Sequence, residues 1–224
     1  SSPDIFYRNN GNSTFTPQRL PLPLFSDSLL STGVSSADID NDGDFDLIVT
    51  TWDHNYLLVN ETRSGDTSWS FSPGNVPRLT TDKHPSTGSL FGDYNNDGFP
   101  DLFITNKGTN ELYINTPGTG FSRIYPSRPE HLYRKANTTG AAVSDFDRDG
   151  DLDLFTANQD TFSLFFINPA SNTSYIRFRL RGVTSNRDGI GARIELVPRD
   201  SAFTAAALLG CRLATFKGGP YSMN

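Results

Sequence analysis

Short apolar runs alternate along most of the chain with polar segments that are rich in glycine. Runs rich in Val, Ile, Leu, Phe and Tyr, bounded by Gly, Asn, Asp, Ser and Pro, are typical of strands joined by turns. No stretch of ten or more residues has a convincing 3.6-residue period, so the pattern predicts no helix. The sequence therefore predicts an all-β fold.

One acidic pattern occurs three times. Residues 38–47 read DIDNDGDFDL, residues 93–102 read DYNNDGFPDL and residues 145–154 read DFDRDGDLDL. Their first aspartates lie 55 and 52 residues apart. Each pattern is preceded at the same offset by a glycine, at Gly33, Gly88 and Gly140. Self-similarity at a fixed period indicates a repeat architecture.

Two strand-like runs follow each acidic pattern, and the second run ends in asparagine. The first runs are residues 47–51, 102–106 and 154–158, and the second runs are residues 55–60, 110–115 and 163–168. Residues 5–15 (IFYRNNGNSTF) match a second run and the residues just after it, so we expect the chain to start partway through a unit. A unit of 52–55 residues with about four short strands has the size of a propeller blade. We therefore expect a partial β-propeller of about three blades plus a partial one.

Each acidic pattern places oxygen ligands at a spacing suited to a cation. Counted from the first aspartate, carboxylate or amide oxygens stand at positions 1, 3, 5 and 9, and glycine stands at position 6, where the loop must turn sharply. A backbone carbonyl at position 7 is expected to complete the set. The predicted side-chain ligands are Asp38, Asp40, Asp42, Asp46, Asp93, Asn95, Asp97, Asp101, Asp145, Asp147, Asp149 and Asp153, and the predicted carbonyl ligands are those of Asp44, Phe99 and Asp151.

This ligand set favours Ca²⁺ over other metals. It contains hard oxygen and no His or Cys, which argues against zinc and copper, and Mg²⁺ demands a stricter octahedral geometry. An EF-hand needs a glutamate at position 12, where these patterns have Val49, Ile104 and Thr156 within strand-like runs. A single loop of this kind is also compatible with an acidic surface turn, but three in register favour about three calcium sites. The site containing Asn95 and Pro100 is expected to be the weakest.

The units resemble FG-GAP/VCBS repeats, which build the propeller of integrin α-subunits and occur in many secreted proteins. The resemblance rests on the pattern G-x₄-D-x-D/N-x-D-G-x₂-D-L and on the asparagine-terminated runs, over about residues 1–170. It implies four-stranded blades in which each acidic loop binds Ca²⁺ between the first two strands. We accordingly expect FG-GAP/VCBS propeller blades over residues 1–172.

Residues 173–224 differ from the repeats and are expected to form a short, separate β segment. Alternation at Tyr175–Leu180 and Ala192–Val197 predicts two strands, with Asp188-Gly189 in the turn segment between them. The string SNRDGIGARIEL (residues 185–196) resembles the start of the ASPIC/UnbV domain, which follows FG-GAP repeats in the cartilage acidic protein family. Residues 201–216 are Ala-rich and apolar where that family continues with a polar strand, so we expect a truncated segment and predict no fold for residues 199–216.

Composition restricts the cellular setting of the 224-residue chain. A net charge of −6 disfavours nucleic-acid binding, and no apolar stretch approaches the 18 residues of a membrane span. The single cysteine, Cys211, allows no intrachain disulfide. Four N-x-S/T sequons in loop-like stretches predict glycosylation at Asn12, Asn60, Asn137 and Asn172. The sequons and the calcium loops together favour a secreted protein.

The chain carries no evident catalytic motif. A GxSxG nucleophile elbow is absent, and carboxylates engaged by Ca²⁺ stay ionised and make poor proton donors. We therefore expect a non-enzymatic calcium-binding module with an extracellular protein or glycan ligand, which the resemblance implies for the matrix or the cell surface.

Two alternatives remain open. The first is a carbohydrate-binding or carbohydrate-acting propeller, suggested by Trp52, Trp69 and the alternating Arg177, Arg179 and Arg181, although the tryptophans are more typical of blade cores. The second alternative is an accessory domain of a larger secreted enzyme.

Overall fold

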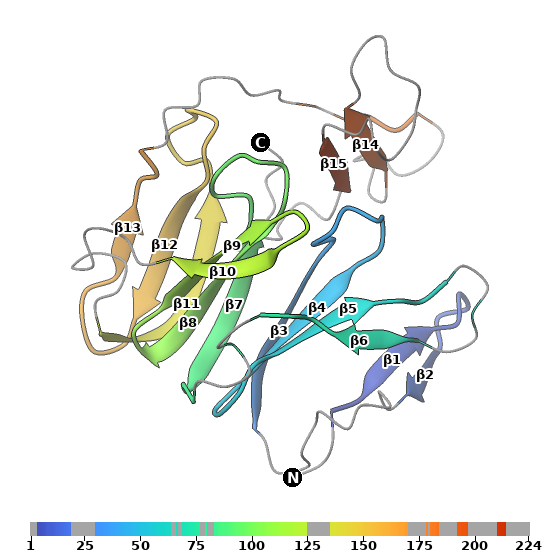
Figure 1. Cartoon of the computed structure of the whole chain (residues 1–224), viewed down its shortest axis with the longest axis horizontal. Helices are drawn as coiled ribbons and strands as arrows, with labels where there is room; N and C mark the ends of the chain where they lie inside the picture. The colour runs from blue at the N-terminus through green and yellow to red at the C-terminus, as the bar shows by residue number, and fades with distance from the viewer. Residues whose placement is uncertain are drawn as a thin grey trace.

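The computed structural model describes residues 4–18, 30–63, 66, 69–76, 79, 83–124, 135–169, 178, 180–183, 192–196 and 210–213 (Figure 1). Every regular element in these ranges is a β-strand, which confirms the predicted all-β class. Within the same ranges, no helix has the length and apolar character needed to cross a bilayer.

Three consecutive groups of antiparallel strands correspond to the three repeats, and we call them blades 1, 2 and 3. Blade 1 contains β3 (Ser31–Ala37), β4 (Asp46–Thr51), β5 (Tyr56–Asn60) and β6 (Phe71–Pro73). Blade 2 contains β7 (Ser86–Gly92), β8 (Asp101–Gly108), β9 (Glu111–Thr116) and β10 (Gly120–Ile124). Blade 3 contains β11 (Ala136–Ser144), β12 (Asp153–Asn158) and β13 (Leu164–Phe166).

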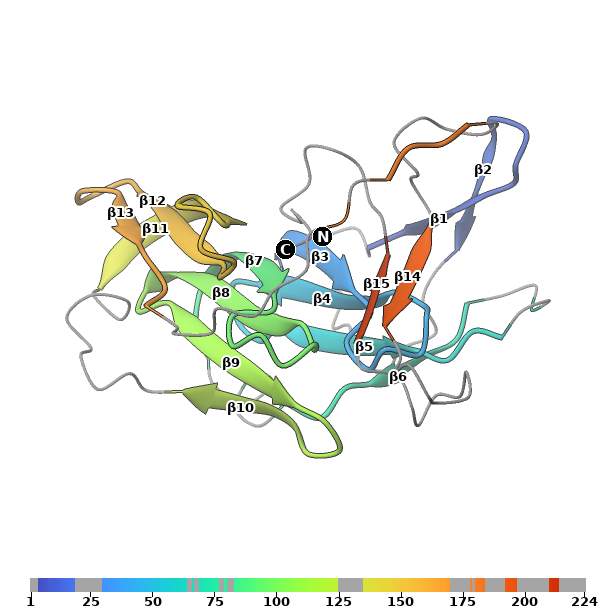
Figure 2. The same ribbon diagram turned by 90° about the horizontal axis from the view of Figure 1, so that it is seen from above.

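The strands of each blade pair in chain order, as in a propeller. Blades 1 and 2 have the predicted four strands, and blade 3 has three within the described residues. Blades 2 and 3 are also joined through β8 and β11, where Ala136 pairs with Gly108 and Asn137 with Lys107. The blades form an open array, with β13 at one edge and the hairpin of β1 (Phe6–Asn9) and β2 (Phe15–Gln18) at the other (Figures 1 and 2). That hairpin is the expected partial unit.

The first strands of the blades, β3, β7 and β11, lie next to one another and connect the blades. The hydroxyl of Thr32 in β3, for example, donates a hydrogen bond to the carbonyl of Ser86 in β7 at 2.8 Å. Each of these strands has a register shift just before its repeated glycine. A Cβ on Gly33 would lie 3.1 Å from the Oγ1 of Thr50 in the same blade and in ordinary contact, at 3.4 Å, with the Cα of Gly88 in the neighbouring first strand.

The hydrophobic core lies between blades. It is built from Ala37, Ile39, Ile48, Leu57, Val76 and Leu79 of blade 1 and its connections and from Phe91, Leu102, Ile104, Tyr113 and Phe121 of blade 2. In β8, the consecutive residues Leu102, Phe103 and Ile104 are all fully buried. A strand that is buried on both faces has neighbours on both sides. The hydrophobic core is therefore formed where successive blades contact each other.

A separate two-stranded antiparallel sheet follows the blades. It pairs β14 (Arg193–Leu196) with β15 (Gly210–Leu213). The strand β14 corresponds to the strand expected at residues 192–197. The other expected strand, at residues 175–180, lies outside the described residues except for residues 178 and 180, and the Asp188-Gly189 turn also lies outside them. The described partner of β14 comes instead from residues 199–216, for which the sequence predicts no fold.

The burial of Phe103 between blades generates a stability prediction. Phe103→Ala should lower the free energy of unfolding by about 3–5 kcal/mol, because it leaves a cavity at a site with no exposed side-chain surface. Phe162→Ala, at an 84% exposed phenylalanine, is the matched control and should change it by less than about 0.5 kcal/mol. Urea denaturation of both variants checks this. Equal losses would show that the contact between blades 2 and 3 is not part of the core.

Candidate metal centre

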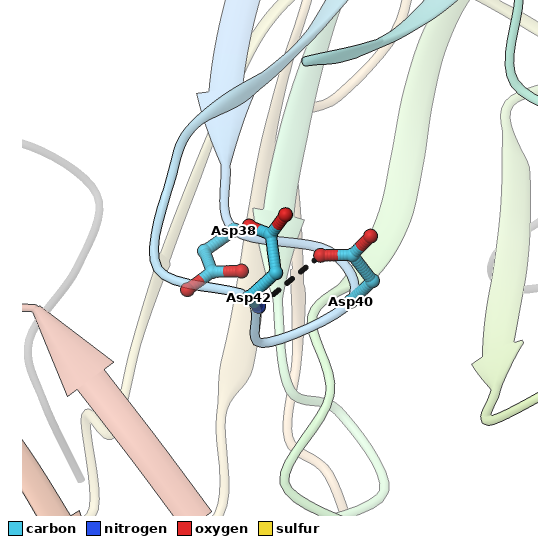
Figure 3. A group of neighbouring side chains, drawn as sticks. All are labelled: Asp38, Asp40 and Asp42. Carbon is cyan, nitrogen blue, oxygen red and sulfur yellow. Dashed lines mark hydrogen bonds between the residues drawn. The ribbon is translucent and has the colours of Figure 1, made fainter. Parts of the chain in front are cut away.

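The three acidic loops occupy the same place in each blade, between the first and second strands. We call residues 38–46 loop 1, residues 93–101 loop 2 and residues 145–153 loop 3. In loop 1, Asp38, Asp40 and Asp42 each offer a carboxylate oxygen, and the three oxygens lie within 4.8 Å of one another (Figure 3). Loop 3 forms the same cluster from its residues at positions 1, 3 and 5, which are Asp145, Asp147 and Asp149. The structure thus brings together three predicted side-chain ligands in each of these loops.

Loop 2 differs at position 3, where the side chain is an amide. The Nδ2 of Asn95 donates a hydrogen bond to Oδ2 of Asp97 at 2.9 Å, and the Oδ1 of Asn95 accepts one from the Asp97 N–H at 3.0 Å. Asp93 accepts hydrogen bonds from the N–H groups of Asp97 and Gly98, both at 3.0 Å. Loop 2 therefore keeps the turn with one carboxylate fewer among positions 1, 3 and 5.

Backbone N–H groups orient the clustered carboxylates. In loop 1 the Oδ1 of Asp40 accepts a hydrogen bond from the Asp42 N–H at 3.2 Å, drawn as a dashed line in Figure 3. The Oδ1 of Asp42 accepts one from the Asp44 N–H at 3.0 Å, and the Oδ2 of Asp38 accepts one from the Gly43 N–H at 3.1 Å. The clustering of the charged oxygens is thus built into the path of the loop.

The sharp turn uses left-handed backbone at two positions. Glycine at position 6 has a φ of 101° in Gly43, 95° in Gly98 and 100° in Gly150, as the sequence predicts. Position 4 also has a positive φ, which was not predicted, with 62° at Asn41, 58° at Asn96 and 69° at Arg148. Asparagine adopts this conformation more readily than most residues, so the two asparagines were the available signal. At Arg148 the same conformation costs about 1–2 kcal/mol.

The buried aspartate at position 9 connects each loop to its own blade by accepting backbone hydrogen bonds. The Oδ2 of Asp46 accepts a hydrogen bond from the Ile39 N–H at 2.9 Å, and its Oδ1 accepts one from the Asn60 N–H at 2.8 Å. Asp101 and Asp153 make the equivalent pair of bonds at 2.8–2.9 Å. A carboxylate has about four acceptor positions, so these bonds are compatible with a further cation. The ligand role of position 9 stays a prediction.

Burial and mutual repulsion raise several pKa values in the loops. Burial raises the pKa of Asp46 and of Asp101 to about 7, against the opposing effect of their backbone hydrogen bonds. Burial, followed by the charges of Asp42, Asp40 and Asp38, raises the pKa of Asp44 at position 7 to about 6. The Oδ1 of Asp44 is buried and has no hydrogen-bond partner within the described part of the chain. Burial therefore disfavours the charged forms of these groups when no cation is present.

Neighbouring loops are linked by asparagine side chains. The Nδ2 of Asn115, at the end of β9, donates a hydrogen bond to the carbonyl of Ile39 in loop 1 at 2.7 Å. The Nδ2 of Asn168 makes the equivalent bond to the carbonyl of Tyr94 in loop 2 at 2.8 Å. The repeated asparagine at the end of the second run is visible in the sequence, but its contact with the preceding blade is not.

A groove of about 480 Å³ opens beside loop 1, between blades 1 and 2. Asp40 and Phe99 of the acidic loops line it together with Leu57, Val59 and residues 117–121, which form the β9–β10 turn and the start of β10. Its volume is within the range of ligand-binding pockets, about 300–1,000 Å³. A ligand in this groove would lie next to the carboxylate cluster of loop 1.

The four predicted glycosylation sites have different surroundings in the structure. Asn12 is exposed in the turn between β1 and β2, whereas Asn137 lies within β11 and donates a hydrogen bond to Gln159 at 2.9 Å. Asn60 is buried, and its amide donates to the carbonyl of Phe45 at 3.2 Å. A glycan on Asn60 would have to displace this contact, and glycosylation at that position stays a prediction. Asn172 lies outside the described residues.

The two tryptophans differ in their surroundings. Trp69 stacks on Phe71 and contacts Phe6, with ring centroids 6.3 and 5.0 Å away, where the β1–β2 hairpin meets blade 1. Trp52 is 47% exposed in the turn between β4 and β5, with the ammonium of Lys107 4.0 Å from its ring centroid. The prediction that Trp52 belongs to a blade core is therefore wrong. Residues 177 and 179 of the arginine row lie outside the described residues.

Comparisons with known proteins agree with this architecture. A sequence model of the FG-GAP-like repeat matches residues 1–49 and 93–156, which together make up just over half of the chain and include all three acidic loops. Cartilage acidic protein 1 of Mus musculus is 25% identical over 211 residues, which cover 90% of this chain and 32% of that protein. The chain thus spans about a third of the length of this relative.

The raised pKa values predict how stability depends on pH in the metal-free chain. Between about pH 4 and pH 7, Asp46 and Asp101 bind more protons in the folded chain than in the unfolded chain, where aspartates titrate near pH 3.9. With EDTA present, the free energy of unfolding should therefore fall as the pH rises through this window. Urea denaturation at about pH 5 and about pH 7.5 measures the difference. A free energy of unfolding that rises over this interval in EDTA would contradict the raised pKa values of Asp46 and Asp101.

Proposed function

The chain belongs to the FG-GAP-like repeat family, and from this premise we propose that it is a non-enzymatic, calcium-stabilised propeller module of an extracellular matrix or cell-surface protein. The observation that carries the proposal is the convergence of three carboxylates to within 4.8 Å at the same position of two different blades. Carboxylates held this close repel one another unless a cation lies between them.

The donor set of the loops fits calcium. Ca²⁺ takes six to eight oxygen ligands and tolerates irregular geometry. Positions 1, 3, 5 and 9 supply side-chain oxygens, and the carbonyl at position 7 supplies another. The partnerless buried oxygen of Asp44 also supports a cation near loop 1. We expect about three ions, with the weakest binding at loop 2, because Asn95 brings no charge.

The expected role of the ions is structural. An ion bound at positions 1, 3, 5 and 9 would join the two ends of a loop, as a disulfide would, and the single cysteine Cys211 can form no such bond within the chain. About three Ca²⁺ ions would also offset the net charge of −6. Binding to the folded state alone stabilises it by mass action. Extracellular modules bind Ca²⁺ at about 10⁻⁴–10⁻³ M, which suits calcium-rich fluids outside cells.

The extracellular setting of the proposal is supported by the similarity to cartilage acidic protein 1 and by the exposed sequon at Asn12. We propose two parts, FG-GAP blades over residues 1–172 and an ASPIC/UnbV-like segment over residues 173–224, of which β14 and β15 are described. The groove beside Asp40 is the candidate site for an extracellular protein or glycan ligand.

Calcium titration by calorimetry, combined with thermal melts, tests this proposal. Asp145→Ala removes a clustered carboxylate from loop 3, so we expect it to abolish one binding site and leave the others. The same variant should lose part of the rise in melting temperature that calcium gives to the unmodified chain.

The matched control is Asp53→Ala, which removes a carboxylate outside the loops. Asp53 pairs with Lys83 at 3.4 Å near the surface, a type of contact worth about 0–1 kcal/mol. It should leave the number of calcium sites unchanged. A melting temperature that EDTA does not alter, or equal site loss in both variants, would contradict the proposal.

A second candidate function is glycan binding, and the exposure of Trp52 is the observation that favours it. Aromatic faces stack on sugars, but Lys107 already lies over this ring. We therefore expect a glycan array to give no signal that depends on Trp52. Binding that persists in EDTA and disappears in Trp52→Ala would favour the glycan function over the calcium-dependent module.

A further inference from the structure

Position 4 of loops 1 and 2 is an asparagine with a left-handed backbone, at Asn41 and Asn96. In each loop this residue stands between two predicted ligands, at positions 3 and 5. Both asparagines are half-buried rather than fully exposed to solvent. Their side chains each contact the acidic loop of the following blade, so position 4 connects loops as well as shaping its own turn.

The two asparagines reach the same part of the next loop. The Nδ2 of Asn41 donates a hydrogen bond to the carbonyl of Gly98, at position 6 of loop 2, at 3.3 Å. The Nδ2 of Asn96 donates one to the Oδ1 of Asp151, at position 7 of loop 3. Asp151 is buried, and a hydrogen bond to a charged acceptor shielded from water is stronger than one between neutral groups. The acceptors differ, but both contacts lie at positions 6 and 7.

Positions 6 and 7 belong to the part of the loop that is expected to complete the ligand set. The peptide group of Gly98 leads directly into Phe99, whose carbonyl is the predicted ligand at position 7 of loop 2. Asp151 supplies the predicted carbonyl ligand at position 7 of loop 3. Each contact therefore begins between two ligands of one loop and ends on, or next to, a ligand residue of the following loop.

A second set of contacts holds neighbouring loops side by side from outside the loops. Asn115 and Asn168 donate to the carbonyls at position 2 of the preceding loop, at 2.7 and 2.8 Å. Asn115 lies in β9, and Asn168 follows β13. Neither asparagine stands between predicted ligands. These contacts place each loop beside the next, and the position-4 asparagines connect the ligand-bearing segments of loops that are already adjacent.

We infer that Asn41 and Asn96 couple neighbouring calcium sites, so that an ion in one loop raises the affinity of the adjacent loop for Ca²⁺; this inference rests on the proposed function. An ion held at positions 3 and 5 fixes position 4 between them. The asparagine amide then holds positions 6 and 7 of the next loop, which has less conformational freedom to lose when it binds its own ion. Such coupling is reciprocal, so an ion in loop 3 also strengthens binding at loop 2.

Electrostatics alone predicts a coupling of the opposite sign. An ion bound in one loop reduces the negative charge that attracts a second cation to the neighbouring loop. That attraction between loops is screened over about 8 Å at 0.15 M salt, whereas a direct hydrogen bond persists. At this salt concentration we therefore expect the contacts of Asn41 and Asn96 to dominate, and the sign of the coupling distinguishes the two effects.

A double-mutant cycle in the full chain measures the coupling between loops 2 and 3. Asp145→Ala removes the site of loop 3, and Asn96→Gly removes the connecting side chain but retains a residue suited to left-handed backbone. The amide NMR signal of Gly98 reports calcium at loop 2, because its N–H donates to Asp93. We expect Asp145→Ala to weaken binding at loop 2 at least about fivefold in the unmodified chain, and about twofold or less in the Asn96→Gly background.

The matched control background is Ser13→Gly, because Ser13 also has a left-handed backbone, with a φ of 66°, but lies in the β1–β2 turn. It should retain the fivefold effect. The lost charge of Asp145 acts in every background, so it cancels from the comparison. Asp149→Ala removes the loop 3 site by a second route, and circular dichroism melts verify that all variants fold.

The possible outcomes separate this inference from the proposed function. Weakening at loop 2 that is the same with and without the Asn96 side chain would overturn the inference while leaving calcium binding intact. Binding at loop 2 that is unchanged or strengthened by Asp145→Ala in the unmodified chain would do the same. A Gly98 signal that calcium never shifts would overturn the proposed function together with the inference.

Discussion

Electrostatic repulsion among converging carboxylates is the constraint on which the rest of the structure depends. Loops 1 and 3 each bring three carboxylate oxygens within 4.8 Å of one another, and backbone N–H groups hold those of loop 1 in place. The same loops join the first and second strands of their blades. A cation that offsets the repulsion therefore stabilises a strand junction, and with it the surface that each blade offers to the next.

The loops are also connected to their neighbours. The position-9 aspartate ties its loop to the end of the third strand of its own blade, as Asp46 does through the N–H groups of Ile39 and Asn60. The side chain of Asn115 then ties blade 2 to the carbonyl of Ile39 in loop 1. One loop thus orders the backbone that the following blade contacts. This arrangement explains why a regular array forms from sheets whose core lies between them.

The sequence was sufficient for the parts of the structure that repeat. The period, the β-rich runs and the glycine at position 6 predicted the strands, the blades and the turn of the loops. Contacts between repeats were not predicted, because a single sequence shows which residues recur but not which surfaces meet. The hydrogen bond of Asn115 to loop 1 is such a contact between blades. The burial of Asn60 against Phe45 and the exposure of Trp52 depend on how each side chain is placed in the folded blade, which the repeat pattern does not show. The left-handed backbone at position 4 was not predicted, because only two of the three loops have asparagine there, at Asn41 and Asn96, and the third has Arg148.

Anomalous X-ray diffraction from crystals grown with Ca²⁺ tests the central claim most directly. We predict density for one ion in each loop, about 2.3–2.6 Å from the oxygens at positions 1, 3 and 5. Ordered loops without such density at a saturating calcium concentration, and with the carboxylates of Asp38, Asp40 and Asp42 turned apart into solvent, would contradict the claim.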